Sequence, residues 1–151
     1  MSAIATAALD LLRSSHMART LASCPCGFAH ADRDGIVLLV DDDECFRSAL
    51  AENLRDDGCK VIEYSAAQEV PPLVGLTDVS VVVTDYEMPG TDGLAFADRF
   101  HAAHPRVPII MVTGWCTSQL EAEAATRGFI SLLPKPLQYD KLHRLLRQLP
   151  E

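Results

Sequence analysis

Residues 79–93 read VSVVVTDYEMPGTDG, and they contain the strongest fold signal in the chain. The valine-rich run at 79–84 is short and continuous, which is typical of a strand buried on both faces of a sheet. Asp85 follows it directly, and residues 88–90 (MPG) have the composition of a turn. Helical spacing of apolar residues begins at Leu94. The stretch therefore predicts a buried strand whose carboxyl end carries an acidic residue and leads into a helix.

The same alternation of apolar runs and helical periodicity extends in both directions. Further strand-like runs cover residues 36–40, 59–64, 107–112 and 129–133. Helices are expected from the face of Phe46, Ala49, Leu50 and Leu54 up to Gly58, from Leu94 to about His104, from Ser118 with Glu121 as a capping box up to Gly128, and over Leu142, Leu145, Leu146 and Leu149. A short, weakly marked helix is expected at 66–73, around Pro71 and Pro72.

Five buried strands that alternate with helices require a parallel sheet with helices on both faces. We therefore predict a doubly wound, flavodoxin-like α/β fold whose five parallel strands have the order 2-1-3-4-5. The regular pattern starts near Gly35. Residues 35–151 form the predicted domain, and residues 1–34 form an N-terminal extension that is expected to be partly helical or flexible.

The overall composition limits the function. The chain has 151 residues, 48% of them hydrophobic and 23% charged, which fits one globular domain. A formal charge of −8 disfavours a nucleic-acid surface. The apolar runs are too short to span a membrane. The five cysteines are scattered and odd in number, so a reducing cytoplasm is the expected compartment.

The N-terminal extension carries two weak signals. Residues 21–24 (LASC) look like a lipoprotein cleavage box, but charged residues at positions 10, 13 and 19 interrupt the apolar segment that should precede it. Cys24, Cys26 and His30 can supply three ligands to a metal, without a fourth. Both signals are weaker than the interpretation of a simple extension.

Polar side chains stand at the carboxyl ends of four predicted strands. Asp41, Asp42 and Asp43 follow the first strand and Asp85 follows the third. A hydroxyl and an ammonium follow the last two strands, at Thr113 and Lys135. Because ligands of open α/β sheets bind outside the carboxyl ends of the strands, we expect these groups to converge on one pocket.

Carboxylates packed together repel one another, by about 4 kcal/mol for two unit charges about 4 Å apart at an effective dielectric near 20. Such a group requires a cation, and oxygen ligands with open positions suit Mg²⁺. A carboxylate beside Mg²⁺ can attack phosphorus and form an acyl phosphate. Each residue alone also has a structural interpretation, as a helix cap, a turn former or a surface charge. Their joint placement favours the functional one.

These residues carry a family resemblance. From residue 36 to its end the chain resembles the receiver domain of bacterial response regulators. Residues 40–43 (VDDD) are similar to the family's acidic pair, and residues 85–93 (DYEMPGTDG) to its phosphoacceptor loop. Residues 109–114 (IIMVTG) are similar to its switch-hydroxyl strand, and residues 135–136 (KP) to its lysine followed by proline.

The resemblance implies a phosphoacceptor and a metal site. Asp85 would accept the phosphoryl group. Asp42 and Asp85 would bind Mg²⁺ directly, together with the main-chain carbonyl of Glu87. Asp41 would contribute through a water molecule.

The resemblance also implies a switch. Thr113 and Lys135 would contact the phosphoryl group, and the bond before Pro136 is expected to be cis. The family usually has Tyr or Phe three residues before the lysine, where this chain has Leu132. We therefore expect weaker signal output than in other members. Trp115 either shields the acyl phosphate or contacts a partner.

The function implied is that of a phosphoacceptor receiver in a two-component or phosphorelay system, acting through protein–protein contacts. Its partner would be a sensor histidine kinase or a histidine phosphotransfer protein, with the downstream target left open. Neither nucleic acid nor membrane is an expected partner. No enzyme activity is expected beyond the receiver's own phosphotransfer and autodephosphorylation. Since the sequence stops at Glu151, the expected type is a stand-alone receiver.

Two alternatives remain at this point. Asp41 and Asp43 have the Asp-x-Asp spacing of haloacid-dehalogenase-like phosphatases, but Cys45 stands where that family has Thr. A pseudo-receiver that binds partners without phosphorylation is the other alternative, for which Leu132 leaves room.

Overall fold

The computed structural model describes residues 35–149. Within them, five parallel strands form one sheet with the order β2-β1-β3-β4-β5, as predicted. The strands are β1 (Ile36–Val40), β2 (Lys60–Tyr64), β3 (Val79–Thr84), β4 (Ile109–Thr113) and β5 (Ile130–Pro134). The doubly wound α/β prediction is therefore confirmed.

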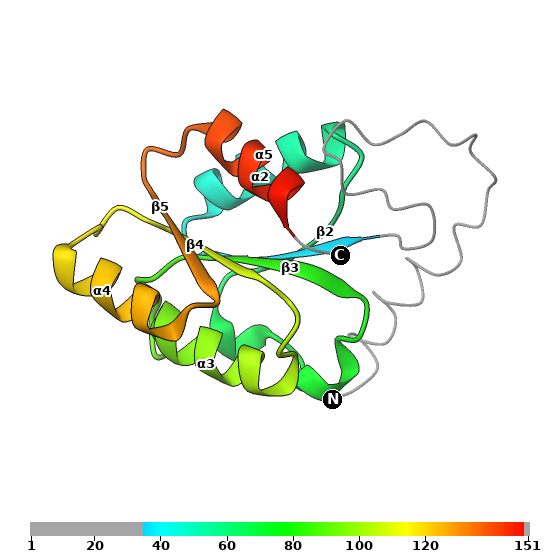
Figure 1. Ribbon diagram of the computed structural model, residues 1–151. Helices are drawn as coiled ribbons and strands as arrows, with labels where there is room; N and C mark the ends of the chain where they lie inside the picture. Colours follow the sequence, from blue (N-terminus) through cyan, green and yellow to red (C-terminus); the bar gives the residue numbers. More distant parts are fainter. Residues whose placement is uncertain (1–34, 150–151) are drawn as a thin grey trace.

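Helices cover both faces of the sheet. They are α2 (Glu44–Asp56), α3 (Gly93–Ala103), α4 (Ser118–Arg127) and α5 (Tyr139–Gln148). Helices α2 and α5 lie on one face, and α3 and α4 lie on the other (Figure 1). This arrangement leaves the carboxyl edge of the strands free of helix packing, so that the loops leaving the strands can form a site there.

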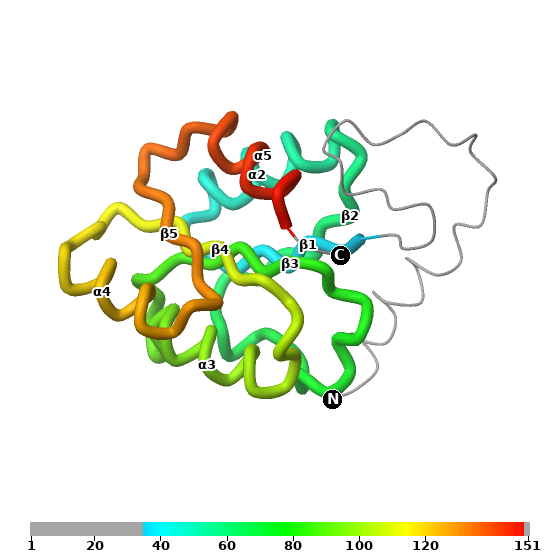
Figure 2. The backbone as a smooth tube through the Cα atoms, viewed as in Figure 1, coloured from blue at the N-terminus to red at the C-terminus, as the bar shows by residue number. Residues whose placement is uncertain are grey.

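The core explains why the central strands are mainly apolar runs. In β1, Val37 and Leu39 pack with α2 and α5, whereas Ile36, Leu38 and Val40 pack on the α3 side. All five side chains are buried. Because neighbouring residues of a strand point to opposite faces, both sets of side chains are buried in a strand covered on both faces, and apolar residues are favoured at every position. The central strands run through the middle of the molecule between the two helical layers (Figure 2).

The prediction of a helix at 66–73 is wrong. Two short 3₁₀ turns, η1 (Ala67–Glu69) and η2 (Leu73–Gly75), connect β2 to β3 instead. Val70 has an extended backbone, with ψ at 124°. Proline disfavours helical geometry in the residue before it and lacks the N–H that a helix needs, so Pro71 and Pro72 stop the helix after one turn.

Two local details of the predicted helices also need correction. Thr117, and not Ser118, caps α4, since its hydroxyl accepts a hydrogen bond from the backbone N–H of Leu120 at 3.2 Å. In α2 the core face includes Ala51 beside Leu50 and Leu54, whereas Ala49 is exposed. The stop at Gly128 is confirmed, with the glycine in the left-handed region at φ 73°.

The predictions for residues 1–34, including the helical stretch and the Cys24, Cys26 and His30 group, lie outside the described residues. Across residues 35–149, the structure contains no helix of sufficient length and apolar character to cross a membrane.

Candidate functional site

The pairing of β1 with β3 brings two aspartates together. Val40 lies opposite Thr84 in the parallel register, and the backbone N–H of Asp85 donates to the carbonyl of Val40 at 2.9 Å. Asp41 and Asp85 directly follow the last residues of β1 and β3, so both lie at the same edge of the sheet. Only 1% of Asp41 and 7% of Asp85 is exposed, although both side chains are carboxylic acids.

Three carboxylates form the acidic group predicted from the sequence. Asp41, Asp42 and Asp85 each offer one oxygen, and these oxygens lie within 4.8 Å of one another. Asp42 is exposed, so solvent and ions reach the group from its side. Hard oxygen donors in a partly open setting are the ligands that Mg²⁺ prefers. The residues present therefore fit a magnesium ion.

Asp43 does not belong to this acidic group. Its carboxylate accepts a hydrogen bond from the backbone N–H of Phe46 at 3.1 Å and caps α2. Its own N–H donates to the Asp41 carboxylate at 2.9 Å. The Asp-x-Asp pair needed for a haloacid-dehalogenase-like site is therefore divided between the pocket and a helix cap.

Lys135 enters the group from the end of β5. Its Nζ lies 2.9 Å from the Asp41 carboxylate and 3.4 Å from that of Asp85. The same ammonium lies over the ring of Phe46, with Nζ 4.2 Å from the ring centroid. Burial acts to lower the pKa of Lys135, but its contacts with the two carboxylates outweigh burial and raise it. The bond to Pro136 is cis, as expected.

The charges of this group do not balance. The two buried carboxylates of Asp41 and Asp85 share the ammonium of Lys135, and the pKa of Asp85 is raised, first by burial and then by the negative charge of Asp41. The ammonium of Lys135 and a hydrogen bond from the Tyr86 N–H at 2.7 Å oppose this shift without cancelling it. A buried excess of negative charge favours the binding of a cation.

Thr113 ends β4 at the same edge of the sheet and is fully buried. Its hydroxyl accepts a hydrogen bond from the N–H of Trp115 at 3.0 Å, which leaves the hydroxyl proton available for another acceptor. The carbonyl of Thr113 accepts a hydrogen bond from the N–H of Lys135 at 2.8 Å, which joins the end of β4 to the residue that follows β5. Trp115 is 60% exposed beside this site.

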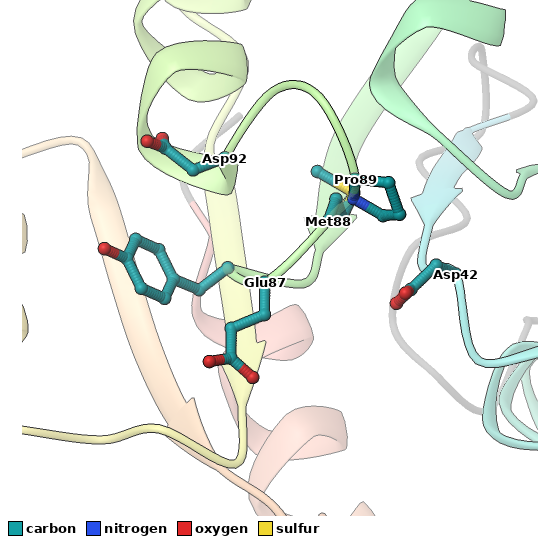
Figure 3. A pocket seen from close by; sticks show the side chains of 6 residues that line it. Asp42, Glu87, Met88, Pro89 and Asp92 are labelled. Atoms are coloured by element: carbon teal, nitrogen blue, oxygen red, sulfur yellow. The ribbon is translucent and has the colours of Figure 1, made fainter.

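An open pocket of about 410 Å³ adjoins the acidic group. Asp42 lines it from the β1 side, and Glu87, Met88 and Pro89 line it from the loop after β3 (Figure 3). Asp92, the cap of α3, also faces the pocket. The pocket gives a ligand access to the exposed side of the acidic group.

Three residues that support the site were not predicted in this role. Gly93 begins α3 directly against the Asp85 backbone, where a Cβ atom would lie 2.2 Å from the Asp85 carbonyl oxygen. The hydroxyl of Thr84 donates to the same carbonyl at 3.0 Å. Phe46 was interpreted only as a helix-face residue. The sequence places Gly93 at a helix start, but the contacts of Thr84 and Phe46 depend on the folded geometry.

Leu132 lies on β5 and is partly buried. It packs against the small cluster of Leu94, Met111 and Leu120, to which Tyr86 also contributes. The position therefore holds an aliphatic side chain in an apolar setting between β4 and α4.

The chain belongs to the response regulator receiver domain family, whose model matches residues 37–147. Receiver domains are signalling modules of two-component systems, phosphorylated on an aspartate by histidine kinases or phosphotransfer proteins, and they bind Mg²⁺ at an acidic pocket. The family predicted from the motifs is thus confirmed. Neither a haloacid-dehalogenase-like phosphatase nor a pseudo-receiver is favoured.

Particular relatives agree with this assignment. The chain is 31% identical over 115 residues to the C4-dicarboxylate transport transcriptional regulatory protein DctD of Rhizobium meliloti, covering 76% of this chain and 25% of that protein. It is 31% identical over 114 residues to the DNA-binding transcriptional regulator NtrC of Escherichia coli, covering 76% and 24%. The chain thus spans about a quarter of the length of these relatives.

Solved structures show the same fold. The signal receiver domain of an HD domain-containing protein from Pseudomonas fluorescens has a TM-score of 0.71 at 28% identity, covering 78% of this chain and 94% of that one. A response regulator receiver protein from Pseudomonas putida has a TM-score of 0.68 at 27% identity, covering 79% and 99%.

Proposed function

We propose that this chain is a phosphoacceptor receiver in which Asp85 takes the phosphoryl group. The observation that carries the proposal is the buried Asp85 carboxylate, crowded by Asp41 and contacted by Lys135 at 3.4 Å. A carboxylate in this position has an oxygen that can act as nucleophile and a neighbouring ammonium that attracts an incoming phosphoryl group.

We propose as metal ligands the residues of this chain that match the ligand positions of the family. Asp42, Asp85 and the main-chain carbonyl of Glu87 would hold Mg²⁺, with Asp41 acting through water. The acidic group and the open side at Asp42 support this assignment. Bound there, the ion would supply positive charge to the oxygens of the phosphoryl group.

In the transfer step, a carboxylate oxygen of Asp85 attacks phosphorus. The new P–O bond forms as the P–N bond of the donor phosphohistidine breaks, and the electron pair of that bond leaves with the imidazole. Lys135 neutralises the charge on the phosphoryl oxygens, and the Thr113 hydroxyl donates a hydrogen bond to one of them. Loss of the phosphoryl group to water, which is autodephosphorylation, resets the domain.

The wider setting follows from this chemistry. We propose that the phosphodonor is a sensor histidine kinase or a histidine phosphotransfer protein in the cytoplasm. Residues 35–151 form the receiver and residues 1–34 an extension. Output passes through protein–protein contacts, without binding of nucleic acid or membrane. The DNA-binding activity named for NtrC belongs to that protein, and the stand-alone type of this receiver stays a prediction.

The test is labelling with a small phosphodonor. Incubated with Mg²⁺ and acetyl phosphate, the protein should gain one phosphoryl group that is stable in acid and removed by hydroxylamine. Chelation of Mg²⁺ or the substitution Asp85→Asn should abolish the labelling. Labelling that persists in Asp85→Asn would contradict the assignment.

A further inference from the structure

Gln68 joins the β2–β3 connection to the loop that follows Asp85. Its side-chain Nε2 donates to the carbonyl of Pro89 at 3.1 Å and to the hydroxyl of Thr91 at 3.3 Å. Gly90 lies between these two acceptors, with φ at +83°, and a Cβ atom there would lie 2.2 Å from the Gln68 amide nitrogen. The side-chain amide of Gln68 therefore packs directly against the middle of the loop.

The turn that carries Gln68 is itself fixed to the molecule. Ala67 is 4% exposed and belongs to the core on the α3 side of the sheet. The carboxylate of Glu69 accepts hydrogen bonds from the N–H and the hydroxyl of Ser65, at 3.1 and 2.7 Å. Gln68 thus extends from an anchored backbone, although its own side chain is exposed.

The two ends of the loop are held by contacts of a different kind. The N–H of Gly93 donates to the carbonyl of Tyr86 at 2.7 Å, which closes the loop at its base. The carboxylate of Asp92 accepts from the N–H of Ala95 at 2.8 Å and fixes the start of α3. Between these ends, the pair of hydrogen bonds from Gln68 fixes the middle of the loop, next to the pocket lined by Glu87 and Pro89.

We propose that Gln68 is a positioning residue that holds this loop ready to bind the metal. The proposal rests on the proposed function, because the loop carries Asp85 and the Glu87 carbonyl assigned as ligands. Gln68 contacts neither the ion nor the phosphoryl group. It reduces the conformations open to the loop before binding, so that less ordering is required when the ion binds.

The experiment compares full-length wild type with Gln68→Met, which keeps the length of the side chain and removes its donor. The Mg²⁺ concentration for half-maximal labelling by acetyl phosphate should rise by about fivefold, as expected for the loss of hydrogen bonds of modest net strength. The labelling rate at saturating Mg²⁺ should stay within about twofold of wild type, because the reacting groups are unchanged. Thr91→Val, which removes one acceptor, should give a smaller rise in the same direction.

Gln119→Met is the matched control, since Gln119 is another exposed glutamine whose amide donates to a side chain, that of Glu123 at 3.0 Å. It should leave the Mg²⁺ requirement unchanged. An unchanged requirement in Gln68→Met as well would overturn the proposal, even if its Tm fell. If wild type were not labelled at all, the proposed function would fail. The rise in Tm with Mg²⁺ concentration would then still decide whether Gln68 affects metal affinity.

Discussion

Asp85 and Asp98 differ in how their charge is balanced. Asp98, on α3, has a partner of its own: Arg127 donates to its two oxygens from Nε at 2.8 Å and from a terminal nitrogen at 3.0 Å. This hydrogen-bonded pair lowers the pKa of Asp98. The pKa of Asp85 is raised, because burial and Asp41 act against its charge more strongly than Lys135 supports it.

A third carboxylate resembles Asp98 and not Asp85. Asp57 follows α2 and accepts a hydrogen bond from the Tyr139 hydroxyl at 2.7 Å, with His143 at 3.7 Å from the same oxygen. Carboxylates with dedicated partners tie elements together, as Asp98 ties α3 to α4 and Asp57 ties α2 to α5. A buried carboxylate that shares one cation with others is instead prepared for a ligand.

From this comparison we expect Asp→Asn substitutions to change the free energy of unfolding in opposite directions at Asp85 and Asp98. The largest effect is expected at Asp85. Asp85→Asn should stabilise the metal-free protein by about 2 kcal/mol, part of the ~4 kcal/mol that two close unit charges cost, because loss of the Lys135 contact offsets the rest. Its Tm should rise by roughly 5 °C. Thermal unfolding with and without Mg²⁺ is the measurement.

In the same unfolding experiment, Mg²⁺ should raise the Tm of wild type and have little effect on Asp85→Asn, since a ligand that binds the folded state stabilises it. Equal melting curves of wild type with and without millimolar Mg²⁺ would contradict the predicted metal site.

The second prediction concerns how far a change in the pocket spreads. Leu132 packs with Leu94, Met111 and Leu120 and has no ring to reorient when Thr113 turns toward a phosphoryl group. A deficit of about 1.4 kcal/mol would reduce the ratio of active to inactive states roughly tenfold. Leu132→Tyr should therefore enlarge the structural response without changing labelling at Asp85.

Amide chemical shifts on addition of Mg²⁺ and beryllofluoride, a phosphoryl mimic, measure this response. We expect modest shifts in α4, β5 and α5 of the wild type. Large shifts throughout residues 118–148 of the unmodified protein would show that Leu132 does not weaken the switch.

A smaller effect is expected at the Asp57 cluster. Tyr139→Phe removes a 2.7 Å hydrogen bond to a carboxylate and should destabilise the protein by about 1 kcal/mol. Labelling at Asp85 should be unchanged, because the cluster joins α2 and α5 away from the pocket residues. Urea unfolding and acetyl phosphate labelling of the same preparation measure both. If Tyr139→Phe lost labelling while the protein was still fully folded, the cluster would have more than a structural role.

The smallest effect is expected at Asp98. Its side chain is 47% exposed, so Asp98→Asn should cost no more than about 0.5 kcal/mol. Because the folded-state pKa is lowered, this contribution is present above the ordinary pKa and disappears as pH falls through the folded value. Unfolding measured at neutral and at acidic pH should show a difference between variant and wild type only at neutral pH. A stabilising effect would remove the contrast with Asp85.

The central strands β1, β3 and β4 were predictable because each is a mainly apolar run, and the acidic group was predictable because parallel strands end at a common edge. Local competition caused the errors. Thr117 and Ser118 are both good helix caps, and the fold uses the earlier one. The helix expected at 66–73 does not form because Pro71 and Pro72 stop it.

The contacts that support the site were beyond sequence reasoning. Lys135 lies over Phe46 across 89 positions of sequence, and Gln68 reaches Pro89 across 21. Nothing in the local composition of either pair signals that they meet. They depend on how closely the helices and turns pack onto the sheet, which only the three-dimensional structure gives.

The most direct test is to identify the aspartate that carries the phosphoryl group. After incubation with Mg²⁺ and acetyl phosphate, the acyl phosphate can be reduced with borohydride, and the modified residue located by peptide mass spectrometry. We predict modification at Asp85 in the wild type, at Asp85 in Asp98→Asn, and at no aspartate in Asp85→Asn. Modification of Asp41, or of any aspartate that has a dedicated partner, would contradict it.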